Sequence, residues 1–130
     1  MDTSTPLRNC RVLLVEDEML VAMATEDALT EAGCEVIGPV TTVDEALGAL
    51  DDHTGFDVVV LDMNLKGESA MPIAENLIER AVPFVVLSGY GTADLPPSHR
   101  HVPVLSKPFD PAALAGALKQ VVPDRVGSAG

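Results

Sequence analysis

An aspartate stands at the end of an apolar segment in this sequence, where Val58–Leu61 leads directly into Asp62. A charged group beside a buried segment is costly, so its presence there suggests that a function requires it. Other apolar segments are also followed by polar or charged side chains, namely Glu16 with Asp17, Ser88, and Lys107. Together these residues supply three carboxylates, a hydroxyl and an ammonium group, a set that could carry out chemistry if the fold brings it together.

The chemistry that suits this set is phosphoryl transfer assisted by a metal ion. Clustered carboxylates repel one another and their pKa values rise unless a hard divalent cation such as Mg²⁺ offsets their charge. An incoming phosphoryl group would meet a positive charge on Lys107 and a hydrogen-bond donor on Ser88. Because carboxylates can attack phosphorus to form aspartyl phosphates, Asp62 is the candidate nucleophile.

The apolar patterning predicts the elements that must position these groups. Short apolar segments typical of buried strands alternate with segments whose apolar residues recur every three or four positions, as on one face of a helix. Gly33 is expected to end the first helix, and Thr42 with Glu45 forms a possible capping box for the second. The predicted strands are Arg11–Val15, Glu35–Gly38, Phe56–Leu61, Phe84–Leu87 and Val102–Leu105. The predicted helices run from about Met19 to Ala32 and begin after Thr42, Ser69 and Asp110.

This alternation predicts an α/β fold with a doubly wound, five-stranded parallel sheet of the flavodoxin-like type. In such sheets ligands bind beyond the carboxyl ends of the strands, so the polar groups that follow the strands should meet at one edge. Residues 89–101 contain two glycines and two adjacent prolines, and an irregular segment or a shortened helix is expected there. We expect one domain over residues 10–122, with residues 1–9 as a flexible N-terminal arm and residues 123–130 as a flexible C-terminal tail.

The composition limits the classes of function. The chain has 130 residues, of which 47% are hydrophobic, and a formal net charge of −12. This charge repels nucleic acid, so no nucleic-acid partner is expected. No apolar segment approaches the roughly 18 residues of a membrane-spanning helix and no secretion signal is visible, so we expect a cytoplasmic protein without a membrane partner. Cys10 and Cys34, together with His53, His99 and His101, lack the spacing of a zinc site.

Four stretches of the sequence resemble the signature motifs of bacterial response-regulator receiver domains, which are CheY-like proteins. The stretches are VLLVEDE, LDMNLKGES, VVLSGYG and LSKPF. Each is weak by itself, but the four occur in the family's order and spacing, and the resemblance covers roughly residues 8–122. It implies a CheY-like fold and a regulator rather than an enzyme, although such a regulator catalyses its own phosphorylation from a phosphodonor and its own slow dephosphorylation.

The resemblance also implies a role for each candidate residue. Asp62 would be the phosphoacceptor, Lys107 would pair with the phosphoryl group, and Ser88 would bind that group on activation. Glu16 and Asp17 match the acidic pair that holds Mg²⁺ directly or through water. Asp62 and the backbone carbonyl of Asn64 would be further metal ligands. The resemblance also implies a cis peptide bond before Pro108.

A narrower resemblance concerns residues 83–91, PFVVLSGYG. This stretch is similar to the FAT GUY single-domain regulators of alphaproteobacteria, which implies a stand-alone regulator in a general stress or multi-kinase network. The chain departs from the usual receiver at Val104, where the family has an aromatic residue that swings inward on activation. Tyr90, the only tyrosine in the chain, could take over this switch role.

The expected function is that of a phosphoacceptor in a two-component system or phosphorelay. The donor would be a phosphohistidine of a sensor histidine kinase or of a histidine phosphotransfer protein, with Mg²⁺ as cofactor. Phosphorylation would switch binding to an unidentified downstream protein, or the domain would act as a phosphate sink. Met19 and Met23 either pack at the edge of the core or form a docking patch for a pair of kinase helices.

Three alternatives make different demands on the sequence. A pseudo-receiver would bind partners without phosphorylation and would not need Asp62, Lys107 and Ser88 together. An aspartyl-phosphate phosphatase of the dehalogenase type uses an aspartate two residues after the nucleophile, where this chain has Asn64. A flavodoxin-like nucleotide or flavin binder needs a glycine- or hydroxyl-rich phosphate loop after the first strand, where VEDEM is acidic.

Overall fold

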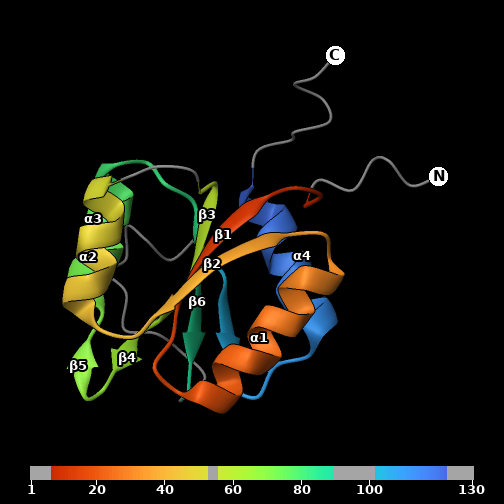
Figure 1. The fold of residues 1–130 in the computed structure, drawn as a ribbon, viewed down its shortest axis with the longest axis horizontal. Helices are drawn as coiled ribbons and strands as arrows, with labels where there is room; N and C mark the ends of the chain where they lie inside the picture. The colour runs from red at the N-terminus through yellow and green to blue at the C-terminus, as the bar shows by residue number, and fades with distance from the viewer. Residues whose placement is uncertain (1–6, 53–55, 90–101, 123–130) are drawn as a thin grey trace.

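The computed structural model describes residues 7–52, 56–89 and 102–122, and a parallel sheet of five strands lies at its centre (Figure 1). The strand order is β2–β1–β3–β6–β7, and all neighbouring strands are parallel. The strands are β1 (Arg11–Val15), β2 (Glu35–Val40), β3 (Val58–Asp62), β6 (Phe84–Ser88) and β7 (Val104–Ser106). The predicted five-stranded parallel sheet of the flavodoxin-like type is therefore confirmed.

Helices cover both faces of this sheet, as a doubly wound fold requires. In the described part of the chain, two helices pack on one face and two on the other, so that each face of the sheet is buried (Figure 1). On the first face lie α1 (Met19–Glu31) and α4 (Pro111–Val121), and on the second lie α2 (Val43–Asp52) and α3 (Met71–Glu79).

The hydrophobic core is divided by the sheet into two clusters. Along β1, Val12 and Leu14 belong to the cluster under α1 and α4, whereas Leu13 and Val15 belong to the cluster under α2 and α3. Successive side chains of a strand point to opposite faces, so an uninterrupted apolar strand fills both clusters. This is why the continuous apolar segments of the sequence correspond to the central strands.

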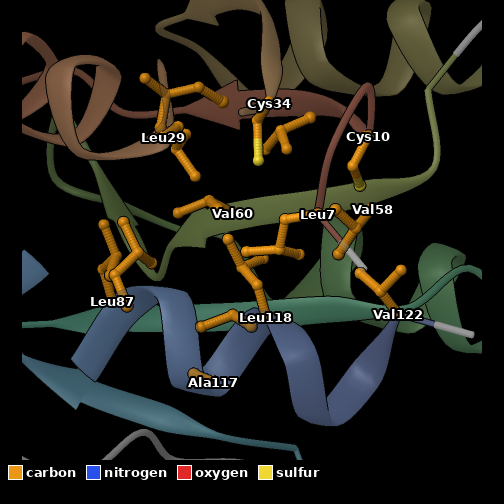
Figure 2. Close-up of a cluster of buried hydrophobic side chains, with 14 of the residues drawn as sticks. Leu7, Cys10, Leu29, Cys34, Val58, Val60, Leu87, Ala117, Leu118 and Val122 are labelled. Atoms are coloured by element: carbon orange, nitrogen blue, oxygen red, sulfur yellow. The ribbon is translucent and has the colours of Figure 1, made fainter. Parts of the chain in front are cut away.

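The cluster under α1 and α4 contains both cysteines of the chain (Figure 2). Cys10 is fully buried and Cys34 is 7% exposed. Leu7 is also fully buried in this cluster, although the predicted N-terminal arm includes it. Among the described residues, the packed part of the chain therefore includes Leu7, because this leucine side chain joins the apolar core. The domain limits at residues 10 and 122 stay a prediction. The rest of the two predicted arms, residues 1–6 and 123–130, lies outside the described residues.

The end of α1 follows the predicted glycine signal. Gly33 has a φ of +97°, in the left-handed region that glycine tolerates best. The N–H of Gly33 donates to the carbonyl of Thr30 at 3.0 Å, and the N–H of Cys34 donates to the carbonyl of Leu29 at 3.0 Å. These two bonds satisfy carbonyls that the end of the helix leaves unpaired.

The start of α2 follows the predicted capping signal with one difference. The hydroxyl of Thr42 accepts a hydrogen bond from the N–H of Glu45 at 3.1 Å, as in a capping box. The carboxylate of Glu45 accepts from the N–H of Thr41 at 2.9 Å, one residue earlier than the usual partner. This bond is the main reason why the pKa of Glu45 lies below its ordinary value.

An irregularity in β2 shapes the end of β1, where the first polar candidates lie. Gly38 has a φ of +103° and is followed by a cis peptide bond to Pro39. A Cβ atom at Gly38 would lie 2.8 Å from the carbonyl oxygen of Leu14, so only glycine fits against β1 here. Beyond this point the N–H of Glu16 donates to the carbonyl of Val40 at 3.0 Å, which fixes the course of the chain as it leaves β1.

A short hairpin after β3 is not predicted from the sequence. It consists of β4 (Asn64–Leu65) and β5 (Glu68–Ser69), which pair antiparallel. Lys66 and Gly67 between them have φ values of +52° and +84°, as a tight two-residue hairpin turn requires. Two-residue strands are too short to produce a periodic pattern, and this is why the sequence contains no sign of them.

Smaller differences concern the limits of other elements. β3 and β7 begin two residues later than predicted, at Val58 and Val104, whereas β2 extends to Val40. The hydroxyl of Ser69 accepts from the N–H of Met71 at 3.1 Å, one residue before the N-cap position of α3. Residues 90–101 lie outside the described part of the chain, so the expected irregular segment stays a prediction. Within the described residues, no helix combines the length and the apolar character needed to cross a bilayer.

Candidate functional site

The carboxyl ends of β1, β3, β6 and β7 bring the predicted polar residues to one edge of the sheet. Asp62 is the last residue of β3 and Ser88 is the last residue of β6, while Glu16 follows β1 and Lys107 follows β7. The N–H of Lys107 donates to the carbonyl of Ser88 at 2.9 Å, and the peptide bond between Lys107 and Pro108 is cis. The parallel topology thus places Lys107 beside a glutamate that lies 91 positions earlier in the chain.

The ammonium group of Lys107 lies among three carboxylates. Its Nζ is 3.0 Å from Oδ2 of Asp62, 2.9 Å from Oε1 of Glu18 and 3.2 Å from Oε1 of Glu16. The side chains of Glu16 and Asp62 are only 0% and 4% exposed, and that of Lys107 is 13% exposed. Burial alone would lower the pKa of Lys107, but the hydrogen bonds to Glu18 and Asp62 and the charges of Asp62 and Glu16 outweigh it and raise the pKa. Lys107 is therefore positively charged at any physiological pH.

Within this group, the ionised form of Glu16 is the least well stabilised. Burial, followed by the hydrogen bond and the charge of Asp62, raises the pKa of Glu16 to about 7, although the N–H of Glu18 and the charge of Lys107 act in the opposite direction. The Oε1 atom of Glu16 is buried and accepts no hydrogen bond among the described residues. It lies within ion-pair distance of Lys107 Nζ, but the hydrogen bond from Nζ goes to Oε2 instead, at 3.3 Å. The single ammonium group of Lys107 therefore does not satisfy both oxygens of this buried carboxylate, and Oε1 of Glu16 is left without a hydrogen bond.

These carboxylates fit a hard divalent cation. One oxygen from each of Glu16, Asp17 and Asp62 lies within 4.8 Å of the others. Such a group of oxygens, with an under-coordinated buried Oε1 on Glu16, is the kind of ligand set that Mg²⁺ prefers. A cation here would also relieve the repulsion between the carboxylates of Glu16 and Asp62.

The hairpin β4–β5 is tied to this cluster by backbone donors. The N–H of Lys66 donates to Oδ2 of Asp17 at 3.0 Å, and the N–H of Asn64 donates to Oδ1 of Asp62 at 3.1 Å. The side-chain oxygen of Asn64 accepts from the N–H of Gly67 at 3.0 Å, so this side chain stabilises the turn. The backbone carbonyl of Asn64 as a metal ligand stays a prediction.

An open cleft lies directly above the cluster. Its volume is about 430 Å³, and because a water molecule takes roughly 30 Å³ in the liquid, it accommodates a hydrated cation together with a phosphoryl group. The residues that line it are Asp17, Glu18, Asp62, Asn64, Gly89 and Lys107.

Of the residues linked to the proposed switch, Ser88 and Val104 lie in the described part of the chain and Tyr90 does not. Ser88 lies 6% exposed at the end of β6, one strand away from Asp62. Val104 begins β7 and packs against the cluster under α2 and α3. The position expected to hold an aromatic switch residue therefore holds a small aliphatic side chain that joins the core. Tyr90 lies outside the described residues, and its role as a substitute switch stays a prediction.

Glu18 is the site residue that is not predicted from the sequence. It occupies the N-cap position of α1, but its side chain makes no capping hydrogen bond and binds Lys107 instead. The sequence offers only a weak signal, which is that a glutamate stands where a serine, threonine or aspartate would cap the helix better. Nothing in the order Glu16-Asp17-Glu18 indicates which of these carboxylates reaches Lys107.

Comparison with known proteins identifies relatives of this chain among regulators. The family described as the response regulator receiver domain matches residues 12–119. The transcriptional regulatory protein PdtaR of Mycobacterium tuberculosis is 29% identical over 116 residues, which cover 86% of this chain and 56% of PdtaR. The phyllosphere-induced regulator PhyR of Methylorubrum extorquens is 28% identical over 115 residues, which cover 85% of this chain and 43% of PhyR. The chain therefore spans about half the length of these curated relatives.

A solved structure similar over most of its length is that of SdrG from Sphingomonas melonis Fr1. It superposes with a TM-score of 0.73 and 39% identity, covering 85% of this chain and 94% of SdrG. A BeF3-activated conformation of SdrG from Pseudomonas melonis Fr1 superposes with a TM-score of 0.68 and 38% identity. That comparison covers 92% of this chain and 97% of SdrG.

Proposed function

This chain belongs to the response regulator receiver domain family of two-component signalling, and we propose that it accepts a phosphoryl group on Asp62 and thereby changes its affinity for a partner protein. The observation that carries the proposal is the 3.0 Å contact between Nζ of Lys107 and Oδ2 of Asp62 beside the carboxylates of Glu16 and Asp17. A nucleophile, a fixed positive charge and a cation-binding group at one open cleft are what phosphoryl transfer needs.

The proposed donor is the phosphohistidine of a sensor histidine kinase or of a histidine phosphotransfer protein. A carboxylate oxygen of Asp62 attacks the phosphorus, so that a P–O bond forms while the P–N bond of the donor breaks. The electron pair of that bond stays on the imidazole nitrogen, which takes up a proton from solvent. Lys107 lies where it can donate to the oxygens of the transferred group, and Ser88 is the proposed second donor after transfer.

Mg²⁺ is the proposed cofactor of this reaction. When bound, it would supply positive charge that offsets the charge of the phosphoryl group and of the carboxylates. Glu16, Asp17 and Asp62 would hold it, with the backbone carbonyl of Asn64 as a further ligand. The orphaned Oε1 of Glu16 supports this assignment from within the chain itself.

An apolar surface beside the cleft supports docking of a protein donor. Met19, Leu20 and Met23, in the first turns of α1, are 63%, 81% and 53% exposed. Large apolar side chains this exposed next to a polar site are typical of an interaction surface rather than of core packing. Of the two interpretations of the methionines, the docking patch is therefore the one that we propose.

Membership of the FAT GUY subgroup stays a prediction. Its motif includes Phe84 at the start of β6 and Ser88 at its end, but it continues through Tyr90, which lies outside the described residues. The proposal that this domain acts in a multi-kinase network depends on that motif and not on the geometry of the cleft.

The test is incubation of the protein with acetyl phosphate or phosphoramidate and MgCl₂, followed by intact mass measurement. We expect one phosphoryl adduct that is lost on treatment with base, because an acyl phosphate hydrolyses readily. The Asp62→Asn variant should carry no adduct. Asp57→Asn is the matched control, because Asp57 precedes the same strand at its opposite end, where its carboxylate accepts from the N–H of Arg11.

A base-stable adduct, or an adduct that persists in Asp62→Asn, would contradict the proposed phosphoacceptor. Absence of any adduct in the wild type with both donors would instead favour the pseudo-receiver alternative, in which the domain binds partners without phosphorylation. The solved BeF3-activated conformation of SdrG supports phosphorylation of Asp62 rather than the pseudo-receiver alternative, because BeF3 imitates a phosphoryl group and SdrG is 38% identical to this chain.

A further inference from the structure

The ammonium group of Lys107 has no spare hydrogen-bond donor. A lysine carries three N–H donors, and in this structure the Nζ donates to Asp62 at 3.0 Å, to Glu18 at 2.9 Å and to Glu16 at 3.3 Å. A phosphoryl group on Asp62 brings new oxygens into the same space. For Lys107 to donate to them, at least one of its present partners must be released.

Exposure decides which partner is the easiest to release. The carboxylate of Glu16 is fully buried and cannot exchange the lysine for water, and Asp62 carries the incoming group itself and so stays beside Lys107. The side chain of Glu18 is 59% exposed and can turn into solvent, where water replaces its hydrogen bond. A phosphoryl group carries close to two negative charges and would also repel the carboxylate of Glu18.

We propose that Glu18 is a positioning residue that holds Lys107 in the resting state and competes with the phosphoryl group for it. This inference rests on the proposed function, because it concerns the same cleft. In the resting protein Glu18 completes the set of partners around the ammonium group. After phosphorylation Glu18 loses Lys107 and moves into solvent at the start of α1. Glu18 therefore weakens the affinity of the site for a phosphoryl group.

The size of this effect follows from the exposure of Glu18. Ion pairs with a solvated partner contribute a fraction of a kilocalorie to about one kilocalorie per mole, which corresponds to a change in affinity of roughly twofold to fivefold. Glu18→Gln removes the charge and keeps the length of the side chain. It also retains the backbone N–H of Glu18, which donates to Oε2 of Glu16 at 3.0 Å. The affinity of Glu18→Gln for a phosphoryl analogue should therefore be roughly twofold to fivefold higher than that of the wild type.

The experiment is a titration with beryllium chloride in excess sodium fluoride and MgCl₂, monitored by amide chemical shifts in ¹H–¹⁵N NMR spectra. The matched control is Glu31→Gln, which removes one negative charge at the opposite end of α1. We expect wild type and Glu31→Gln to have the same affinity and Glu18→Gln to bind more tightly. Because salt screens a solvated charge strongly at about 1 M, the advantage of Glu18→Gln should shrink between roughly 0.1 M and 1 M NaCl.

The salt dependence separates this role from a purely structural one, because a packing defect would not be relieved by screening. An affinity of Glu18→Gln equal to or lower than that of the wild type would overturn the inference. An increase of the same size in Glu31→Gln would overturn it as well, because net charge alone would then explain the result. If the wild type bound no beryllium fluoride at all, the proposed function would fail, and this inference with it.

Discussion

The carboxylate of Glu16 makes the stability of the domain depend on pH. Its pKa in the folded protein is about 7, against an ordinary value of 4.5. Between these two pH values the folded state keeps a proton on Glu16 that the unfolded state has lost. Stability contributed by this group is therefore present at low pH and is lost as the pH rises through the window from 4.5 to about 7.

We expect this loss to reach about 3 kcal/mol at most in the absence of divalent cations, from the size of the pKa difference. The measurement is the free energy of unfolding in urea at several pH values for wild type and Glu16→Gln, in the presence of EDTA. Glutamine cannot ionise, so the stability of the wild type relative to Glu16→Gln should decline across the window. Parallel pH profiles for the two proteins would show that Glu16 ionises normally.

The residues around Lys107 also show what sequence can reveal about a site. Asp62 and Lys107 could be paired in advance because each follows an apolar strand, and the ends of parallel strands share an edge. The contact between Glu18 and Lys107 could not be predicted, because it depends on the rotamer of a largely exposed side chain at the start of α1. The sequence places residues at an edge of the sheet, whereas the exact set of contacts depends on packing that leaves no periodic pattern.

At the scale of elements, long apolar segments were predictable and short turns were not. β1 has the predicted bounds, because the four consecutive buried apolar residues Val12–Val15, preceded by the exposed Arg11, leave few alternatives. The hairpin β4–β5 depends on positive φ values at Lys66 and Gly67 and on the bond from Lys66 to Asp17. A lysine in a left-handed conformation is uncommon, and its tertiary partner cannot be anticipated from the local sequence.

Two glycines in different elements should respond in opposite ways to replacement by alanine. Gly38→Ala places a Cβ 2.8 Å from the carbonyl oxygen of Leu14 at a φ of +103°, and should destabilise the protein by about 1–3 kcal/mol. Gly48 lies within α2, where an added Cβ would meet nothing within 4 Å beyond the backbone of its own helix turns, so Gly48→Ala should stabilise by about 0.5–1 kcal/mol. Urea denaturation of the two variants and the wild type measures both effects. Destabilisation by Gly48→Ala, or tolerance of Gly38→Ala, would contradict the local geometry.

For the whole molecule, a cation bound at the proposed site would oppose an unfavourable distribution of charge. The chain carries a formal net charge of −12, and four of its carboxylates gather at or beside one cleft, namely those of Glu16, Asp17, Glu18 and Asp62. A ligand that binds only the folded state stabilises it, and the gain in free energy grows with the logarithm of the ratio of ligand concentration to dissociation constant. Binding of Mg²⁺ should therefore be visible as a change in global stability and not only in phosphorylation.

We expect MgCl₂ at about ten times its dissociation constant to raise the free energy of unfolding by about 1.4 kcal/mol, and EDTA to reverse the effect. The measurement is thermal or urea denaturation at constant ionic strength, with NaCl replacing MgCl₂ in the reference. Asp17→Asn should lose most of the increase, because Asp17 offers a carboxylate oxygen to the cluster. Asp44→Asn, which removes a charge from the first turn of α2, should keep it. Equal responses of the two variants would place the cation elsewhere.

The burial of both cysteines has a practical consequence for studying this domain. The chain contains only these two thiols, and both lie in the cluster under α1 and α4 (Figure 2). A hydrogen bond with Cys10 and burial raise the pKa of the Cys34 thiol, which keeps it in the unreactive protonated form. A cysteine introduced at Met23 would therefore react with maleimides far faster than either native thiol. A fluorophore could be attached beside the cleft, and partner encounters followed in real time, without altering the interior of the protein.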